Sequence, residues 1–428
     1  MAAEVFTFPV DAVAPALAPQ IRFGPPMRVA GRLVHHVKDS RSAQFYRIGP
    51  REHFVLSKLD GSHTFAKISS EHQRAFGREI PAAGWRQLLQ LAQSRNMLAA
   101  SATPGGNPAV DPLPRFSHAG YTAFYFRLLS PHTLLCQLDR YAGWIYSRPA
   151  ALTLAAVILL AEAFVAFQAA SLIAITLAAL HQHLWPVFAT FLAFLYGSLV
   201  IHEAAHGLTC AHFGGDVSDM GIMLRYLALF PYCKLNDLLV IPNRVHRAAI
   251  VLAGPTASLI VMLPFAVVYL AAPGGSLWKP VSALMLTVYN LLSLMNLIPF
   301  LQLDGYFLLS TWLGRPRLRE EANQFFLRGI GLIGPASGET AVPREDRAFY
   351  FAYGLTSTLI TTAFIGWGTF CWHQMLIRLT TPLKAWLAIA MIFLSVATLW
   401  ILIRRRTQRG EADAEIGGKH HGASKGEV

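Results

Sequence analysis

The sequence is poor in cysteine and in charged residues, and each deficit excludes a class of protein. Only 4 cysteines occur in 428 residues and none forms a CxxC pair, which excludes a disulfide framework and a cysteine-based structural zinc site. Charged residues make up 14% of the chain against 54% hydrophobic residues, a balance that soluble domains do not show. The net charge of +12 is dispersed, without the basic stripe and interleaved aromatic residues of a nucleic-acid surface. We therefore expect a membrane protein with no nucleic-acid partner.

No charged segment followed by a short apolar run opens the chain, so we expect no cleavable signal peptide. We expect the N-terminal region to stay in the cytoplasm. Six later segments are long and apolar enough to cross a bilayer, at residues 150–172, 186–210, 247–271, 281–303, 350–372 and 385–403. Arginine and lysine gather behind the second, fourth and sixth of these predicted spans, which places both termini in the cytoplasm by the positive-inside rule. The expected location is the inner (cytoplasmic) membrane.

The predicted fold class is mainly α, a polytopic membrane protein with about six transmembrane helices and a small N-terminal cytoplasmic α+β domain. In that domain, strand-like runs at residues 31–37 and 43–49 precede apolar residues at helical spacing. The predicted parts are a disordered leader (1–27), the α+β domain (28–100), a linker (101–120), an interfacial helix (121–148), the membrane domain (149–403) and a basic disordered tail (404–428).

A short polar motif interrupts the second predicted span. His202, Glu203 and His206 form the pattern HExxH in a segment that is otherwise almost purely apolar. Two histidines four residues apart share one face of a helix, so both imidazoles can reach one metal ion with the glutamate beside it. The composition makes one chance match in the chain a roughly 2 per cent event, and polar residues at membrane depth are costly and usually functional. The pattern indicates metal-assisted hydrolysis.

A third ligand is offered by Asp304, in the sequence NLIPFLQLDG at the end of the fourth predicted span. Pro299 and Gly305 interrupt the helix there and free the carboxylate to turn toward a metal ion. The predicted second and fourth spans run in the same direction, so His202 and Asp304 lie at similar depth. Together with His206 they would leave a fourth position for water, as a catalytic zinc ion requires. Cys210, one helical turn beyond His206, is a weaker candidate.

The two motifs together resemble the site-2 protease family of intramembrane zinc metalloproteases, whose second motif has the form NxxPxxxxDG. The resemblance implies one zinc ion (Zn2+) per chain, held by His202, His206 and Asp304, with Glu203 as the general base for peptide hydrolysis. It further implies a catalytic role for Asn296, in positioning substrate or stabilising the oxyanion. A hydrogen bond between helices is an equally open interpretation of Asn296.

Residues 213–244, between the second and third predicted spans, are apolar but interrupted by glycine and proline and rich in strand-forming residues. This composition excludes a simple helix, and an exposed strand edge could bind an extended substrate through main-chain hydrogen bonds. The family has membrane-dipping strands near this place, so the resemblance favours a substrate clamp. Gly254 and Pro255 also match a glycine-proline pair of the family, although we favour a packing kink as their interpretation.

The N-terminal domain, with its strands before its helices and the tripeptide Leu59-Asp60-Gly61, resembles the PqqD-like winged-helix module that binds leader peptides of ribosomally made natural products. This implies a peptide or small precursor as partner, captured by an edge strand, with peptide-export or peptide-modification proteins as further partners. A winged helix with a structural or regulatory role is the alternative.

The expected function is that of a zinc-dependent intramembrane endopeptidase, linked to leader-guided peptide maturation or export. Two alternatives stay open: regulated intramembrane cleavage of a membrane-anchored regulator, and a non-hydrolytic zinc-binding component of export or immunity. Glu162, an acidic residue within the first predicted span, is interpreted either as a functional relay or as a structural residue paired with another helix. His212 and His246 flank membrane ends and are left outside the site.

Overall fold

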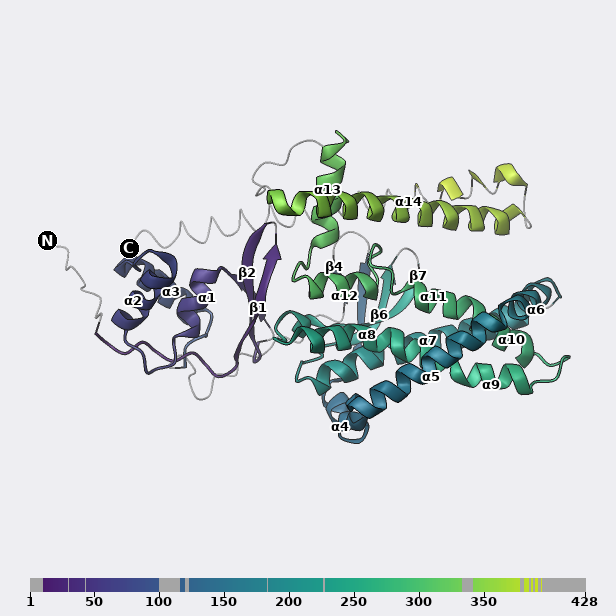
Figure 1. Cartoon of the computed structure of the whole chain (residues 1–428), viewed down its shortest axis with the longest axis horizontal. Helices are drawn as coiled ribbons and strands as arrows, with labels where there is room; N and C mark the ends of the chain where they lie inside the picture. Colours follow the sequence, from purple (N-terminus) through teal and green to yellow (C-terminus); the bar gives the residue numbers. More distant parts are fainter. Residues whose placement is uncertain are drawn as a thin grey trace, which may run out of the picture.

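The computed structural model describes residues 11–394, apart from residues 30, 43, 100–115, 120–122, 183, 226–227, 333–341, 378–380, 385, 388 and 392–393. The predicted basic tail and most of the predicted linker lie outside these residues. Figure 1 shows three parts along the long axis: the helices of the N-terminal domain, a β-hairpin, and a bundle of longer helices.

The N-terminal domain is an antiparallel sheet followed by three helices. Its strands pair in the order β1-β2-β3, and its elements are β1 (Ile21–Val29), β2 (Arg32–Asp39), β3 (Gln44–Ile48), α1 (Pro50–Ser57), α2 (Phe65–Phe76) and α3 (Ala82–Ser94). The side chain of Thr64 caps α2, and Gly77, at φ +67°, ends it. Val37, Ile68 and Trp85 fill the core between sheet and helices. The predicted strands at 31–37 and 43–49 and the predicted helical region are confirmed.

The prediction of a disordered leader over residues 1–27 is wrong for its second half. Residues 21–27 belong to β1, which pairs with β2, and Ala14 and Ala18 are buried in the domain. The alanine- and proline-rich composition misled because small residues can pack closely against the helices, and because a strand at a sheet edge tolerates proline. Residues 1–10 lie outside the described part of the chain.

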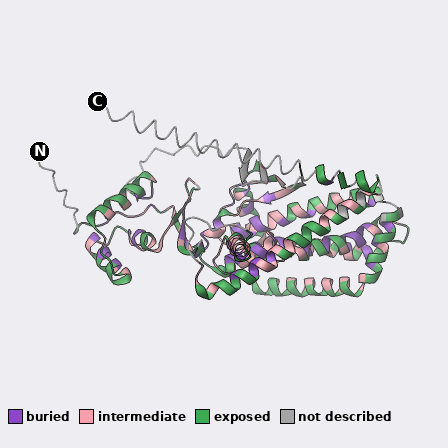
Figure 2. Cartoon of the chain, turned by 90° about the horizontal axis from the view of Figure 1, so that it is seen from above, coloured by how far each residue is buried: buried purple, intermediate pink, exposed green. Residues whose placement is uncertain are grey.

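Four helical segments in the described residues are long and apolar enough to cross a membrane, namely Arg148–Phe167, Trp185–His212, Arg244–Ala271 and Arg344–Phe370. They coincide with the first, second, third and fifth predicted spans. Their helices are α5 (Arg148–Phe167), α7 (Leu184–His212), α8 (Arg244–Val261), α9 (Leu263–Ala271) and α14 (Arg347–Ile377). Figure 2 shows long exposed stretches on the bundle helices, and the large apolar side chains Leu159 and Trp367 are among those exposed. Exposed apolar surface of this extent suits contact with lipid.

The fourth and sixth predicted spans are not among these four segments. Residues 278–295 form a run of three shorter pieces, α10 (Trp278–Leu284), the π-helical turn η4 (Met285–Tyr289) and α11 (Asn290–Met295). A short apolar helix at Pro382–Met391 covers the start of the sixth, and nearly all of its remainder lies outside the described residues. The remaining helices are α4 (His132–Ala142), η2 (Gly143–Tyr146), α6 (Ala169–Gln182), η3 (Asn236–Leu239), α12 (Asp304–Trp312), α13 (Leu318–Gly329) and η5 (Arg344–Asp346).

A second antiparallel sheet lies beside the bundle, in the order β4-β5-β6-β7, from β4 (Phe116–Ala119), β5 (Ala123–Leu129), β6 (Met220–Arg225) and β7 (Ala228–Cys233). The last two strands confirm that residues 213–244 are not a simple helix. The predicted interfacial helix at 121–148 is wrong over β5, and β4 takes the end of the predicted linker. β5 pairs with β4 just before it and with β6 about a hundred residues later. Aromatic residues suit a strand as well as an interfacial helix, so the composition of this segment did not decide between the two.

A pH effect is expected in the N-terminal domain. Burial lowers the pKa of His36, and nearby Arg47 and His35 lower it further. Burial and His35 also lower the pKa of His53, whose ring stacks on that of His35 at 3.7 Å. Because both histidines resist protonation in the folded state, the unfolded state gains protons first as the pH falls below about 6.5.

The domain should therefore lose stability between pH 7.5 and 5.5. Hydrogen exchange of residues 32–57, corrected for the intrinsic pH dependence, should accelerate at the lower pH in the wild type. The acceleration should be smaller in a His36→Gln, His53→Gln double variant. Equal protection at both pH values in the wild type would contradict the prediction.

Candidate metal centre

The two histidines of the HExxH motif lie on one face of α7. Their side chains are buried, with 6% and 4% of the surface of His202 and His206 exposed. One helical turn separates them, and their rings meet edge to face with centroids 4.8 Å apart. The apolar sequence around the motif makes α7 a continuous helix over this stretch, so the pair has a rigid support.

Asp304 is brought to the histidines by a break in the chain between α11 and α12. It is the first residue of α12, where an acidic side chain is favoured by the helix dipole. Asn296 fixes its orientation: the Asn296 side-chain amide donates to Oδ2 of Asp304 at 2.6 Å, and the Asp304 backbone amide donates to Oδ1 of Asn296 at 3.2 Å. Gly305 is required next to it, because a Cβ there would overlap the backbone carbonyl of Leu297.

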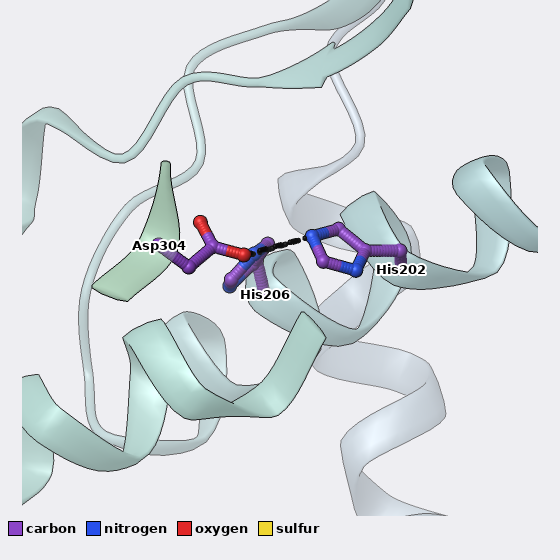
Figure 3. Close-up of side chains that lie close together, drawn as sticks. All are labelled: His202, His206 and Asp304. Atoms are coloured by element: carbon purple, nitrogen blue, oxygen red, sulfur yellow. Dashed lines mark hydrogen bonds and ion pairs between the residues drawn. The ribbon is translucent and has the colours of Figure 1, made fainter. Parts of the chain in front are cut away.

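The three side chains converge on one point, as Figure 3 shows. Nε2 of His202 lies 3.1 Å from Nε2 of His206 and 3.0 Å from Oδ2 of Asp304. Nε2 of His206 lies 3.4 Å from the same Oδ2. A tetrahedral zinc ion with bonds of about 2.0–2.1 Å sets its ligand atoms roughly 3.3 Å apart. The buried group of His202, His206 and Asp304 can therefore hold a metal ion.

The other nitrogen of each imidazole is held by α8. Nδ1 of His202 lies 2.9 Å from the hydroxyl of Ser258, and Nδ1 of His206 lies 2.7 Å from the backbone carbonyl of Ile250. The carbonyl accepts only, so Nδ1 of His206 carries the proton and Nε2 is left with its lone pair facing the cluster. Such outer contacts orient metal-binding histidines and raise their basicity.

Gly254 supplies the space in which the two imidazoles meet. It lies in α8 between Ile250 and Ser258, and a Cβ at this position would overlap the Nε2 atoms of both histidines. The packing kink favoured from the sequence is therefore not its main effect. The absence of a side chain at Gly254 keeps the metal-facing side of the histidines open.

Glu203 lies beside the cluster without joining it. Its carboxylate feels the charges of His202, His206 and Asp304, and the backbone amide of Cys233, at the end of β7, acts as its hydrogen-bond donor. The side chain is partly exposed, whereas the ligands His202 and His206 are buried. A carboxylate placed in this way can exchange protons with a molecule bound at the cluster.

The other residues singled out in the sequence take varied places. Asn296 contacts Asp304, as described above, and its catalytic role stays a prediction. Cys210 is buried in an apolar cluster and is not part of the metal-binding group. Glu162 accepts a hydrogen bond from Asn290 at 3.0 Å, which is the helix-paired arrangement. His212 contacts Asp139 at 2.8 Å, and His246 stacks on Phe213.

Sequence reasoning missed the contribution of α8. Ser258 and the carbonyl of Ile250 gave no signal, because a serine in an apolar helix and a backbone oxygen belong to no motif. The pair Gly254-Pro255 was the available hint. Of these two residues, Gly254 is the one whose lack of a side chain makes room for the two imidazoles.

Comparisons with protein-family models, with curated proteins and with solved structures gave no match to this chain.

Replacing Gly254 by alanine should abolish metal binding, because the added methyl group would overlap Nε2 of His206 and Nε2 of His202 and displace both imidazoles. Gly197→Ala is the matched control, since Gly197 lies in α7 and a Cβ there meets nothing within 4 Å. The measurement is the metal content of both detergent-purified variants after metal loading. A Gly254→Ala protein that binds metal as the wild type does would contradict the site geometry.

Proposed function

We propose that this protein is a zinc-dependent intramembrane endopeptidase that cleaves a peptide or small precursor. The observation that carries the proposal is the convergence of His202, His206 and Asp304 at tetrahedral spacing, with Glu203 beside them. The two histidines lie on α7, a helix long and apolar enough to cross a membrane. Buried ionisable groups in such a setting are expensive and are kept for function.

The donor set favours zinc. Two imidazole nitrogens and one carboxylate oxygen are ligands that zinc accepts, and three protein ligands are the number found in catalytic zinc sites. Zinc bound here would supply Lewis-acid chemistry, lowering the pKa of water toward about 7 and polarising a carbonyl group. A purely structural zinc site would be closed by a fourth protein ligand, and no fourth ligand joins the group among the described residues.

Glu203 is the residue that moves protons in this proposal. It accepts a proton from the attacking water and returns it to the amine that leaves when the peptide bond breaks. Its freedom from the ligand cluster matters, because a carboxylate held as a ligand could not act as a base. Asp304 contributes a negative charge. The hydrogen bond from the Asn296 side chain keeps the Asp304 carboxylate in one orientation.

The strand β7 offers a place for an extended substrate. It is the last strand of its sheet. The backbone amide of its final residue, Cys233, donates a hydrogen bond to the carboxylate of Glu203. A peptide that adds to the free edge of β7 by main-chain hydrogen bonds would run past Glu203 in the extended form that hydrolysis requires. This arrangement supports the substrate clamp expected from the sequence.

The N-terminal domain places three strands before three helices, and we propose that it acts as a peptide-binding winged helix that captures the precursor. β3 is an edge strand of its sheet and carries mostly partly exposed residues, so a leader peptide can pair with it. The protein would lie in the cytoplasmic membrane with both termini in the cytoplasm, where precursor and export or modification partners are made.

The hydrolytic part of the proposal is tested with the Glu203→Gln variant. Wild-type protein in liposomes, loaded with zinc and incubated with peptides and small proteins from cells, should generate new N-termini that mass spectrometry detects. The variant keeps the size of the side chain but loses its basicity, so cleavage should fall by about 10²–10⁴-fold. Cleavage at the wild-type rate in Glu203→Gln would exclude Glu203 as the base.

The inactive Glu203→Gln protein also identifies the substrate class. Crosslinking of the full-length variant in membranes should capture short soluble precursors if it processes leader-bearing peptides. Capture of single-span membrane proteins instead would replace this part of the proposal by regulated intramembrane cleavage.

A further inference from the structure

The β1–β2 hairpin contacts the membrane part of the chain at two separate places. Figure 1 shows it standing between the N-terminal helices and the long-helix bundle. One contact lies next to the end of α7, which carries His202 and His206, and the other lies next to the end of α12, which begins with Asp304. The hairpin therefore contacts the segments that follow the two helices carrying the metal ligands.

The first contact is a buried ion pair. Nζ of Lys38 donates to both carboxylate oxygens of Asp237, at 2.6 and 2.8 Å, and each side chain is only 2% exposed. Asp237 also accepts the backbone amide of Asp216 at 2.8 Å. Arg22, the partner of Lys38 in the strand register, donates to the carbonyl of Gly214 at 2.8 Å. These contacts fix the segment that directly follows α7.

The second contact joins the other end of β1 to the segment that follows α12. The backbone amide of Arg28 donates to the carbonyl of Gly314 at 2.7 Å, and its guanidinium contacts Asp346 at 3.2 Å. Asp346 is also held by Arg315 at 2.7 Å. Arg28 lies six positions after Arg22 in the strand, so the two contacts lie about 20 Å apart along β1.

An irregularity in β1 lets this strand lie close to the segment around Leu239. Its register shifts between Phe23 and Pro26, and Gly24 within the shift lies so close to the carbonyl of Leu239 that a Cβ would overlap it. A buried ion pair such as Lys38 with Asp237 costs desolvation and adds little net stability compared with apolar side chains. Its two directed bonds instead fix the hairpin in one place on the membrane part.

The helices α7 and α12 connect these contacts rigidly to the metal ligands. His206 lies six residues before the end of α7, about 9 Å along the helix, and Asp304 lies at the start of α12, whose length is about 13 Å. A change in the spacing of the two helix ends therefore moves the histidines relative to the carboxylate. Metal affinity is sensitive to such changes in the supporting shell.

We propose that the β1–β2 hairpin is a positioning element of the metal centre, with Lys38 and Arg28 as positioning residues, so that the state of the N-terminal domain controls the site. The proposal rests on the proposed function for the role of the metal ion. Control can pass through the sheet, since Lys38 of β2 pairs in register with Phe45 of the edge strand β3.

The test uses full-length variants at both contacts. Lys38→Met with Asp237→Leu removes both buried charges together and so avoids the large cost of leaving one charge unpaired. Arg28→Gln weakens the second contact at a side chain that is 44% exposed, where misfolding is not expected. Arg32→Gln is the matched control, because Arg32 is an exposed arginine of the same hairpin.

Two quantities are measured. Zinc affinity, from competition with a chelator, should fall about 10-fold or more in the Lys38, Asp237 double variant and in Arg28→Gln, but not in Arg32→Gln. Hydrogen exchange of residues 202–215 and 296–305 in the metal-free protein should accelerate in the same two variants. Unchanged affinity and exchange in both would overturn the proposal and leave the hairpin a simple tether.

The exchange measurement separates this proposal from the proposed function, because it needs no metal ion. Faster exchange in the variants of a protein whose wild type binds no zinc would overturn the peptidase assignment, while the mechanical link between hairpin and helices would stand. If the wild type binds zinc but exchange and affinity are unchanged in the variants, the link between hairpin and metal centre would be overturned, while the peptidase assignment would stand.

Discussion

The close packing of α8 against α7 is the contact on which the metal centre depends. Within two helical turns, α8 provides the carbonyl of Ile250, the empty side-chain position of Gly254 and the hydroxyl of Ser258. The Ile250 carbonyl and the Ser258 hydroxyl hold the Nδ1 atoms of His206 and His202. Gly254, which has no side chain, leaves the Nε2 atoms of both histidines free. In an apolar bundle unpaired imidazoles would be costly, so the same contacts satisfy the polar groups and aim them at Asp304.

The ligand set was predictable because it belongs to short local patterns. His202 and His206 follow from helical spacing, and the break around Pro299 and Gly305 predicts that Asp304 can turn toward them. Among the described residues, the structure brings these three together. What surrounds them was not predictable, since it arises from contacts between segments far apart in sequence. Ser258 belongs to no motif, and the role of Gly254 depends on which helix packs against it.

The same distinction holds for the fold. The four longest apolar helices follow from composition alone, and the strands and helices of the N-terminal domain follow from local periodicity. β1 was missed although its hairpin partner β2 was predicted, because the two prolines within it weaken the local strand signal, and β5 was missed because β6, one of its partners, lies about a hundred residues away. The hairpin that β1 forms is also where the N-terminal domain meets the bundle of long helices, through a lysine and an aspartate 199 residues apart.

The most direct test of the metal centre is the zinc content of the purified protein, with wild type measured beside Asp304→Ala and Glu203→Gln. An open His, His, Asp site predicts about one zinc ion per chain in the wild type and in Glu203→Gln, and little in Asp304→Ala. Absence of zinc from the wild type under metal-replete conditions, or its full retention in Asp304→Ala, would contradict the account.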